Sequence, residues 1–256
     1  MRRTAVLLAM VVGLCAVGAG VSYGAAVSNH RYDWYIVRNS THRTPWAPAV
    51  ARGLLFTYRG AYALSNKSRF MYLTMDERYE NGYTAGILDV LKRNKVPVTF
   101  FCTGGYIKSR PALVRRMVAE GHLVGNHTLT HPNMVAKAAN WAAYKKEIVE
   151  TEAAYHAATG QTMAKIVRMP SGIYSARTLY FNKTLGYRTY FWSFAYADWD
   201  RSHQPTTTYA RKLILANTHW GEIMLLHAVS KTNYLVLDSV IKNLKAQGYV
   251  FKLLPR

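Results

Sequence analysis

Short β-rich apolar runs alternate with longer amphipathic runs along most of this chain, and this alternation restricts its possible folds more than any other feature. The runs with strand character are Met71–Met75, Val98–Cys102, His122–Gly125, Ile166–Met169, Arg188–Phe194, Ile223–His227 and Tyr249–Leu253. The intervening runs with helix character are Thr84–Arg93, Ala112–Glu120, Asn140–Ala158, Ala176–Leu185, Thr206–Ala216 and Leu235–Gln247. This repeated alternation predicts an α/β fold with a parallel sheet. Right-handed crossovers allow a closed barrel or an open doubly wound sheet, and periodicity does not distinguish them.

The first residues have the pattern of an export signal. Arg2 and Arg3 form a charged start, and an apolar run follows from Ala5 to Val21. We expect residues 1–26 to be a signal peptide or an N-terminal membrane anchor, because small residues precede a cleavage site after position 26 and the apolar run is nearly long enough to span a bilayer. Either outcome predicts a protein that is secreted or anchored outside the cytoplasmic membrane, in the cell wall or periplasmic space.

The rest of the chain divides into two predicted parts. Residues 27–69 are irregular in pattern, with scattered Tyr, Trp and Pro, and are predicted to form a lead segment that packs on the domain. Residues 70–256 contain the strand–helix alternation and are predicted to form the catalytic domain.

The chain is strongly basic, with 33 Lys and Arg against 13 Asp and Glu and a formal net charge of +20. Such a field attracts polyanions, although a solvated basic surface that only sets solubility is an equal alternative. Nucleic acid is not expected as a partner, because no DNA- or RNA-binding pattern occurs and export argues against it. We expect anionic cell-wall polymers as possible partners and membrane contact only through the N-terminal segment.

Polar residues occur at the ends of five predicted strands. They are Asp76, His127, Arg168, Asp198 and His227. Because the carboxyl ends of parallel strands share one rim, these side chains are expected to converge there. A single such residue is usually a cap or a turn residue, whereas five polar residues at equivalent ends of parallel strands predict an active site.

His127 and His131 are four positions apart in the segment His-Thr-Leu-Thr-His. This spacing allows both imidazoles to bind one metal ion if the segment turns helically. The pattern is weak alone, because paired surface histidines are common. A metal site with an open position for water needs a third protein ligand, usually a carboxylate.

Five ordered segments together resemble the motifs of the polysaccharide deacetylase family, which is the NodB-homology domain or carbohydrate esterase family 4. They are Thr74–Asp76, His127–His131, Arg168–Gly172, Asp198–Trp199 and Leu225–His227. The resemblance spans roughly residues 70 to 253 and implies a distorted (β/α) barrel with seven strands. Within the family the chain is most similar to the delta-lactam-biosynthetic de-N-acetylases, which act on muramic acid in peptidoglycan. Three further segments carry that similarity: Tyr79–Thr84, Phe191–Ser193 and Gly248–Lys252.

The resemblance implies a catalytic role for four residues. Amide hydrolysis needs an activated water, a stabilised oxyanion and a proton for the leaving amine. Asp76 matches the general base, and Arg168 matches the arginine that keeps this base ionised and oriented. His227 matches the general acid, and Asp198 matches the residue that supports the histidine as a cation.

The resemblance also implies metal-binding and substrate-binding residues. His127 and His131 match two imidazoles that bind a divalent metal ion, with zinc expected and magnesium, manganese or cobalt also possible. Such an ion would polarise the carbonyl and activate the attacking water. The backbone N–H near Ser171 matches the oxyanion donor. Leu225 and Trp199 match a small apolar pocket for the acetyl methyl group.

The first motif departs from the family pattern, which usually has two aspartates and a glycine, with the second aspartate as the third metal ligand. Here Asp76 is followed by Glu77 and Arg78. We predict Glu77 as the third metal ligand, with a carboxylate that is one methylene longer. Arg78 adds a fixed positive charge near the predicted metal, where it would weaken metal binding, point outward or bind the lactyl carboxylate of the substrate.

The sequence therefore predicts a hydrolase that removes the N-acetyl group from N-acetylmuramic acid in peptidoglycan glycan strands. One alternative is deacetylation of N-acetylglucosamine in peptidoglycan or chitin-like polymers. A second alternative is a non-catalytic wall-binding homologue, which only Glu77 and Arg78 support.

Overall fold

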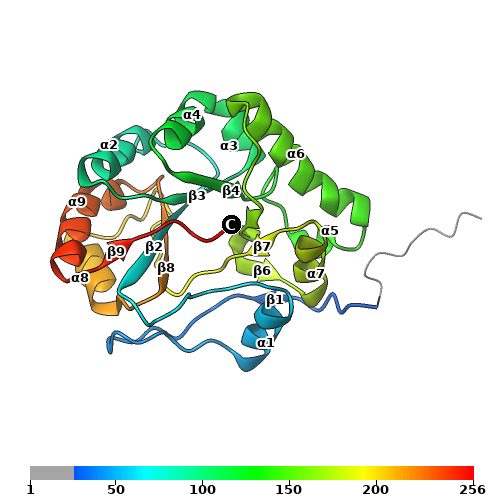
Figure 1. Cartoon of the computed structure of the whole chain (residues 1–256), viewed down its shortest axis with the longest axis horizontal. Coiled ribbons are helices and arrows are strands. Elements are labelled where there is room, and N and C mark those ends of the chain that lie inside the picture. Colours follow the sequence, from blue (N-terminus) through cyan, green and yellow to red (C-terminus); the bar gives the residue numbers. More distant parts are fainter. Residues whose placement is uncertain (1–25) are drawn as a thin grey trace, which may run out of the picture.

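The computed structural model describes residues 26–256, so the predicted signal or anchor lies outside the described part except for its last residue. Seven parallel strands form the main sheet (Figure 1). In spatial order they are β7 (Arg188–Thr189), β5 (Ile166–Val167), β4 (Leu123–Asn126), β3 (Thr99–Cys102), β2 (Phe70–Glu77) and β8 (Glu222–His227), with β9 (Val250–Phe251) beside the start of β2.

The sheet curls so that its two outer strands approach each other. β7 does not pair with β8, but the chain that follows β7 does. The N–H of Leu225 donates to the carbonyl oxygen of Phe194 at 2.8 Å, and the N–H of Ser193 donates to that of Ile223 at 2.9 Å. A parallel bridge joins Phe194 to Met224. The α/β prediction of a distorted seven-stranded (β/α) barrel is therefore confirmed, with irregular backbone at the seam between β7 and β8.

Helices surround the outer face of the curled sheet (Figure 1). They are α2 (Thr84–Asn94), α3 (Gly104–Ser109), α4 (Pro111–Ala119), α6 (Trp141–Thr159), α7 (Ala176–Thr184), α8 (Thr207–Asn217) and α9 (Lys231–Ala246). The six predicted helices are present, and α9 begins earlier than predicted because the Ser230 hydroxyl caps it by accepting from the N–H of Asn233 at 3.1 Å. Gly186 and Gly248 follow α7 and α9 with φ of +81° and +84°, the left-handed conformation that favours glycine at the end of a helix.

Several short elements were not predicted. They are β1 (Tyr32–Asp33), α1 (Ala49–Thr57), α3, α5 (Met134–Lys137), the 3-10 turn Pro170–Gly172 and β6 (Ile173–Tyr174). β1 pairs antiparallel with β6 outside the main sheet. Except for α1, which has nine residues, these elements are too short to show a periodicity, so tertiary contacts and not local pattern set their conformation.

Side chains alternate between the two faces of β2, which crosses the centre of the molecule. Met71, Leu73 and Met75 belong to the core between sheet and helices. Tyr72 belongs to a separate cluster inside the barrel. Because successive residues of a strand point to opposite faces, this alternation decides which residues near the end of β2 face the barrel interior.

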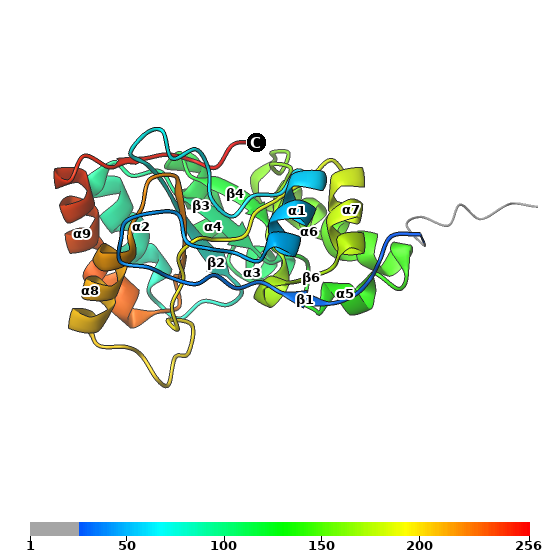
Figure 2. The same ribbon diagram turned by 90° about the horizontal axis from the view of Figure 1, so that it is seen from below.

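The lead segment packs along one side of the barrel (Figure 2). Trp34 and Leu55 are buried in one cluster with Tyr174 and Phe191. The Trp34 ring stacks on the Phe191 ring with centroids 4.8 Å apart, and its Nε1–H donates to the carbonyl oxygen of Trp192 at 3.0 Å. These contacts place the lead segment against the chain that follows β7. Within residues 26–256, no helix has the length and apolar character needed to cross a membrane.

Candidate active site

A cavity of about 500 Å³ lies at the carboxyl ends of the barrel strands. Eight predicted site residues line it: Asp76, Arg78, His127, His131, Ser171, Trp199, Leu225 and His227. Arg168 and Asp198 are fully buried directly behind this lining, where Arg168 pairs with Asp76 and Asp198 pairs with His227. The structure thus brings together residues from five strand ends, as the parallel topology requires.

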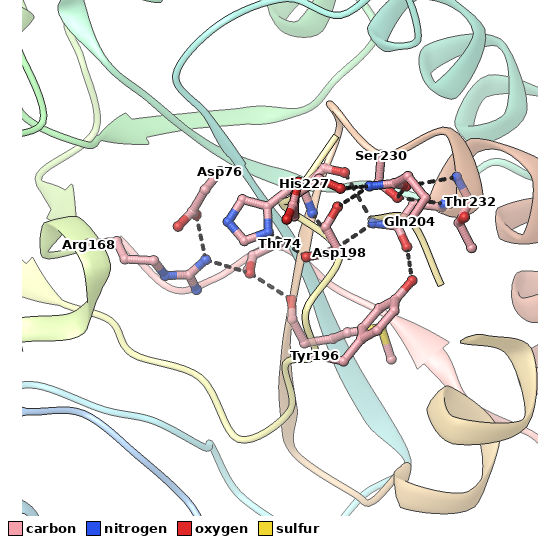
Figure 3. Close-up of polar contacts among 12 residues, drawn as sticks. Thr74, Asp76, Arg168, Tyr196, Asp198, Gln204, His227, Ser230 and Thr232 are labelled. Atoms are coloured by element: carbon pink, nitrogen blue, oxygen red, sulfur yellow. Dashed lines mark hydrogen bonds and ion pairs between the residues drawn. The ribbon is translucent and has the colours of Figure 1, made fainter. Parts of the chain in front are cut away.

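Asp76 and Arg168 form a buried ion pair on one side of the cavity (Figure 3). The Nη1 of Arg168 donates to Asp76 Oδ1 at 2.7 Å and to the Thr74 hydroxyl oxygen at 2.8 Å. Burial acts to raise the pKa of Asp76, but Arg168, followed by His127 and His227, outweighs it, so the pKa of this carboxyl lies below its usual value. Asp76 is therefore held ionised.

Further contacts fix the position of Arg168, which directly follows β5. Its Nε and Nη2 donate to the carbonyl oxygens of Tyr190 and Phe191, both at 3.3 Å. The guanidinium carbon lies 4.3 Å from the centre of the Phe101 ring. Because four of its five N–H donors and one of its faces are engaged, Arg168 presents Asp76 to the cavity in one orientation.

Asp198 and His227 form a second pair across the cavity (Figure 3). The Nδ1 of His227 lies 2.7 Å from Asp198 Oδ1, and the backbone N–H of His227 donates to Oδ2 at 2.9 Å. Nδ1 is thus the protonated nitrogen that donates to the carboxylate, which directs Nε2 away from Asp198. Burial acts to lower the pKa of His227, but Asp198 raises it more strongly, and the net shift is upward.

Two amide side chains hold Asp198 in place. Asn233 Nδ2 donates to Asp198 Oδ2 at 2.5 Å and to the His227 carbonyl oxygen at 3.1 Å. Gln204 Nε2 donates to the Asp198 carbonyl oxygen at 2.9 Å, and its Oε1 accepts from the Ser230 hydroxyl at 2.6 Å (Figure 3). Neither amide was predicted, because single Asn and Gln residues outside the motifs carry no signal in the sequence.

His127 and His131 lie side by side in the cavity, with ring centroids 4.9 Å apart. His127 Nδ1 donates to the Arg168 carbonyl oxygen at 2.9 Å, so Nε2 carries the free lone pair, 3.5 Å from Asp76 Oδ2. Burial, followed by His127 and Arg78, lowers the pKa of His131 to about 4. Burial also lowers the pKa of His127. Both rings are therefore neutral near pH 7, as metal ligands must be.

The expectation that this histidine segment turns helically is wrong. Thr128 and His131 have φ of +67° and +61°, a left-handed conformation that costs about 1 kcal/mol or more per residue outside glycine. Buried neighbours hold it: Asn126 Oδ1 accepts from the N–H of Thr128 at 2.8 Å, and the Glu147 carboxylate accepts from the N–H and hydroxyl of Thr130, both at 2.9 Å. The two imidazoles are brought together by a braced loop and not by a helical turn.

The structure also contradicts Glu77 as a third metal ligand. Glu77 belongs to β2, one residue beyond Asp76, and therefore points to the helix-facing side of the sheet with Met75. Its side chain is fully buried, does not line the cavity, and has no hydrogen-bond partner for either carboxylate oxygen. Burial, followed by Glu80 and Asp76, raises the pKa of Glu77 well above its usual value, which disfavours its charged form.

The donor set in the cavity fits a metal ion held by two imidazoles. In the described part of the chain, no group of three or more His, Cys, Asp or Glu residues is arranged to hold a metal ion. Asp76 is the carboxylate that lies nearest His127, but its other oxygen is engaged by Arg168. A site with three protein ligands including Glu77 therefore does not fit this structure.

Three aromatic residues not assigned as site residues line the cavity with the predicted ones. They are Tyr79, Trp192 and Tyr196. Tyr79 and Trp192 lie in segments that resemble the delta-lactam-biosynthetic de-N-acetylases. That resemblance was the sequence signal by which they could have been identified. Trp199 lies at the edge with 58% of its surface exposed, whereas Leu225 is buried.

Comparison with known proteins shows the family of the chain. The model of the polysaccharide deacetylase family matches residues 64–190. Over 230 residues the chain is 46% identical to an uncharacterised 30.6 kDa protein of Geobacillus stearothermophilus, covering 90% of this chain and 86% of that protein. Over 233 residues it is 39% identical to the peptidoglycan-N-acetylmuramic acid deacetylase PdaA of Bacillus subtilis, covering 91% of this chain and 88% of PdaA.

A solved structure supports the same assignment. The structure of Bacillus subtilis PdaA, a family 4 carbohydrate esterase, matches with a TM-score of 0.85 at 38% identity, covering 89% of this chain and 96% of that one. The chain belongs to the polysaccharide deacetylase family, carbohydrate esterase family 4, and is an enzyme of the carbohydrate deacetylase type similar to PdaA.

Proposed function

We propose that this protein hydrolyses the N-acetyl group of N-acetylmuramic acid in peptidoglycan glycan strands. Similarity to PdaA supports peptidoglycan deacetylation, and the match extends over most of both chains. The observation that carries the proposal is the presence of two ion pairs in one cavity. Asp76 has a lowered pKa and His227 a raised one, which is the separation that an acid–base pair needs at a common pH.

Each member of the two pairs has a distinct task. Asp76, ionised by Arg168, accepts the proton of the water that attacks the acetyl carbonyl. His227, held as a cation by Asp198, gives its Nε2 proton to the departing amine of the sugar. The backbone N–H at Ser171 donates to the oxyanion, and Leu225 and Trp199 bound the pocket for the acetyl methyl group.

His127 and His131 would hold the divalent metal ion on which family members generally depend. A bound ion would polarise the acetyl carbonyl and lower the pKa of the attacking water. We propose zinc because imidazole ligands suit it, with magnesium, manganese or cobalt as substitutes.

The proposed site of action is outside the cytoplasmic membrane. The export-signal pattern of residues 1–26 supports this location, and the net charge of +20 supports attraction to anionic wall polymers. Binding to purified wall sacculi should therefore weaken as the salt concentration is raised. Binding that does not change with salt would contradict the proposed electrostatic attraction to wall polymers.

The reaction is tested with glycan strands from which the stem peptides have been removed. Acetate release and the mass of the muramic residues are followed with the purified protein, with and without a chelator, and with His227→Ala. Deacetylated muramic acid that is lost in the variant and under chelation supports the proposal. Deacetylation of glucosamine residues alone would favour the second substrate, and no acetate under any of the four metals would favour a non-catalytic wall-binding protein.

A further inference from the structure

The charged groups around the cavity are balanced except for Arg78. Asp76 is neutralised by Arg168, and His227 is paired with Asp198. Arg78 lines the same cavity, and no carboxylate within residues 26–256 forms an ion pair with it. The cavity therefore carries one fixed positive charge that the described protein residues do not pair.

The position of Arg78 is set by the end of β2. It directly follows Glu77, and its carbonyl oxygen accepts from the Thr103 hydroxyl at 3.5 Å. Arg78 lines the cavity together with His131, on the side where β2 ends.

The proposed substrate carries a negative charge at a matching place. In N-acetylmuramic acid the lactyl ether is attached to the ring carbon next to the one that bears the acetamido group. A sugar whose acetyl group lies between Asp76 and His227 therefore carries its lactyl carboxylate on the adjoining ring carbon, within reach of the cavity that Arg78 lines. N-acetylglucosamine has a hydroxyl at that carbon and offers no charge there.

We propose that Arg78 is a specificity-determining residue that binds the lactyl carboxylate of the muramic acid residue being deacetylated. This inference rests on the proposed function. A guanidinium presents parallel N–H donors that match the two oxygens of a carboxylate, so it favours the acidic sugar over the neutral one. A charge-assisted hydrogen bond of this kind gives a preference of roughly tenfold or more, reduced by salt because Arg78 is exposed.

The test compares two substrates that differ only in that charge. One is a peptide-free glycan oligosaccharide with free lactyl carboxylates, and the other is the same material after methyl esterification. The ratio of kcat/KM on the two is measured for the wild type, Arg78→Gln, Arg78→Lys and the matched control Arg93→Gln. Arg93 is an exposed arginine in the last turn of α2, so the control removes one charge outside the cavity.

The wild type and Arg93→Gln should prefer the free acid roughly tenfold, Arg78→Gln should show a ratio near one, and Arg78→Lys should fall between them. A ratio in Arg78→Gln equal to that of the wild type overturns the role of Arg78. Equal use of both substrates by the wild type overturns it as well, while leaving the deacetylase intact. If the wild type hydrolyses neither substrate, the proposed function fails. In that case the role of Arg78 is tested by binding alone. The ratio of the affinities for the free acid and the methyl ester is measured for the same four proteins, with the same expected order.

Discussion

Asp76 and Glu77 are consecutive residues of β2, yet their carboxyl groups lie on opposite faces of the sheet. Asp76 faces the cavity and pairs with Arg168, whereas Glu77 is buried toward the helices without a hydrogen-bond partner. The pKa of the first is lowered and that of the second is raised. One step along a strand thus separates an acid whose charged form is favoured from one whose charged form is disfavoured.

This arrangement predicts that metal binding does not depend on Glu77. Glu77→Gln should retain the zinc content and zinc affinity of the wild type, because the side chain does not enter the cavity. His131→Ala should lose most of its affinity, because one of two imidazole ligands is removed. Metal content after dialysis and competition with a chelator measure both. A loss of zinc in Glu77→Gln comparable to that in His131→Ala would restore Glu77 as a ligand.

The raised pKa of Glu77 also predicts a pH-dependent stability. The stability that this acid contributes is fully present below its ordinary pKa of 4.5 and is lost as pH rises toward the raised folded-state value. Glu77→Gln keeps the shape and cannot ionise, so its Tm should exceed that of the wild type by a few degrees or more at pH 8 and by less at pH 5. Thermal unfolding in metal-free buffer measures the difference. An advantage that does not change with pH would show that Glu77 is not held protonated.

Asp198 is expected to control the basic side of the pH profile. Because Asp198 raises the pKa of His227, Asp198→Asn should lower that pKa and move the alkaline fall in kcat/KM to lower pH. The rate should drop by about 10²- to 10⁴-fold, which is typical for the loss of a general acid. Asp200→Asn is the matched control, since Asp200 pairs with His203 and not with His227. An unshifted alkaline limb in Asp198→Asn would exclude His227 as the group that titrates there.

Arg168 is expected to support both the fold and the base. Arg168→Met leaves Asp76 buried without its partner, which should cost about 3–5 kcal/mol of unfolding free energy. Adding Asp76→Asn should recover part of that loss, because the unpaired charge is removed. Denaturant unfolding of the single and double variants measures the coupling. Arg168→Lys, which keeps the charge, should fold and show the acidic limb of kcat/KM at higher pH, and losses that simply add would argue against a coupled pair.

The convergence of the site could be predicted from the sequence because it follows from topology. Asp76, His127, Arg168 and His227 occur at or next to the ends of parallel strands, which must share one rim. The error at Glu77 arose from the predicted end of the first strand at Met75. β2 continues to Glu77, so the strict alternation of a strand still applies there and turns this side chain outward.

The backbone of the metal-binding loop could not be predicted in the same way. A spacing of four residues is compatible with a helical turn and with other bends. The left-handed conformation at Thr128 and His131 depends on Glu147, and on the amides of Gly104 and Gly105, which donate to the carbonyl oxygens of Thr128 and Leu129, both at 3.0 Å. These partners are distant in sequence, and no local pattern indicates them.

The seam between β7 and β8 separates the two partners of the general acid. Asp76 and Arg168 lie at the ends of β2 and β5, on the continuous side of the sheet. Asp198 and His227 stand on the two sides of the seam, and their pairing requires the chain after β7 to dock on β8. The position of the general acid is thus tied to the closure of the barrel.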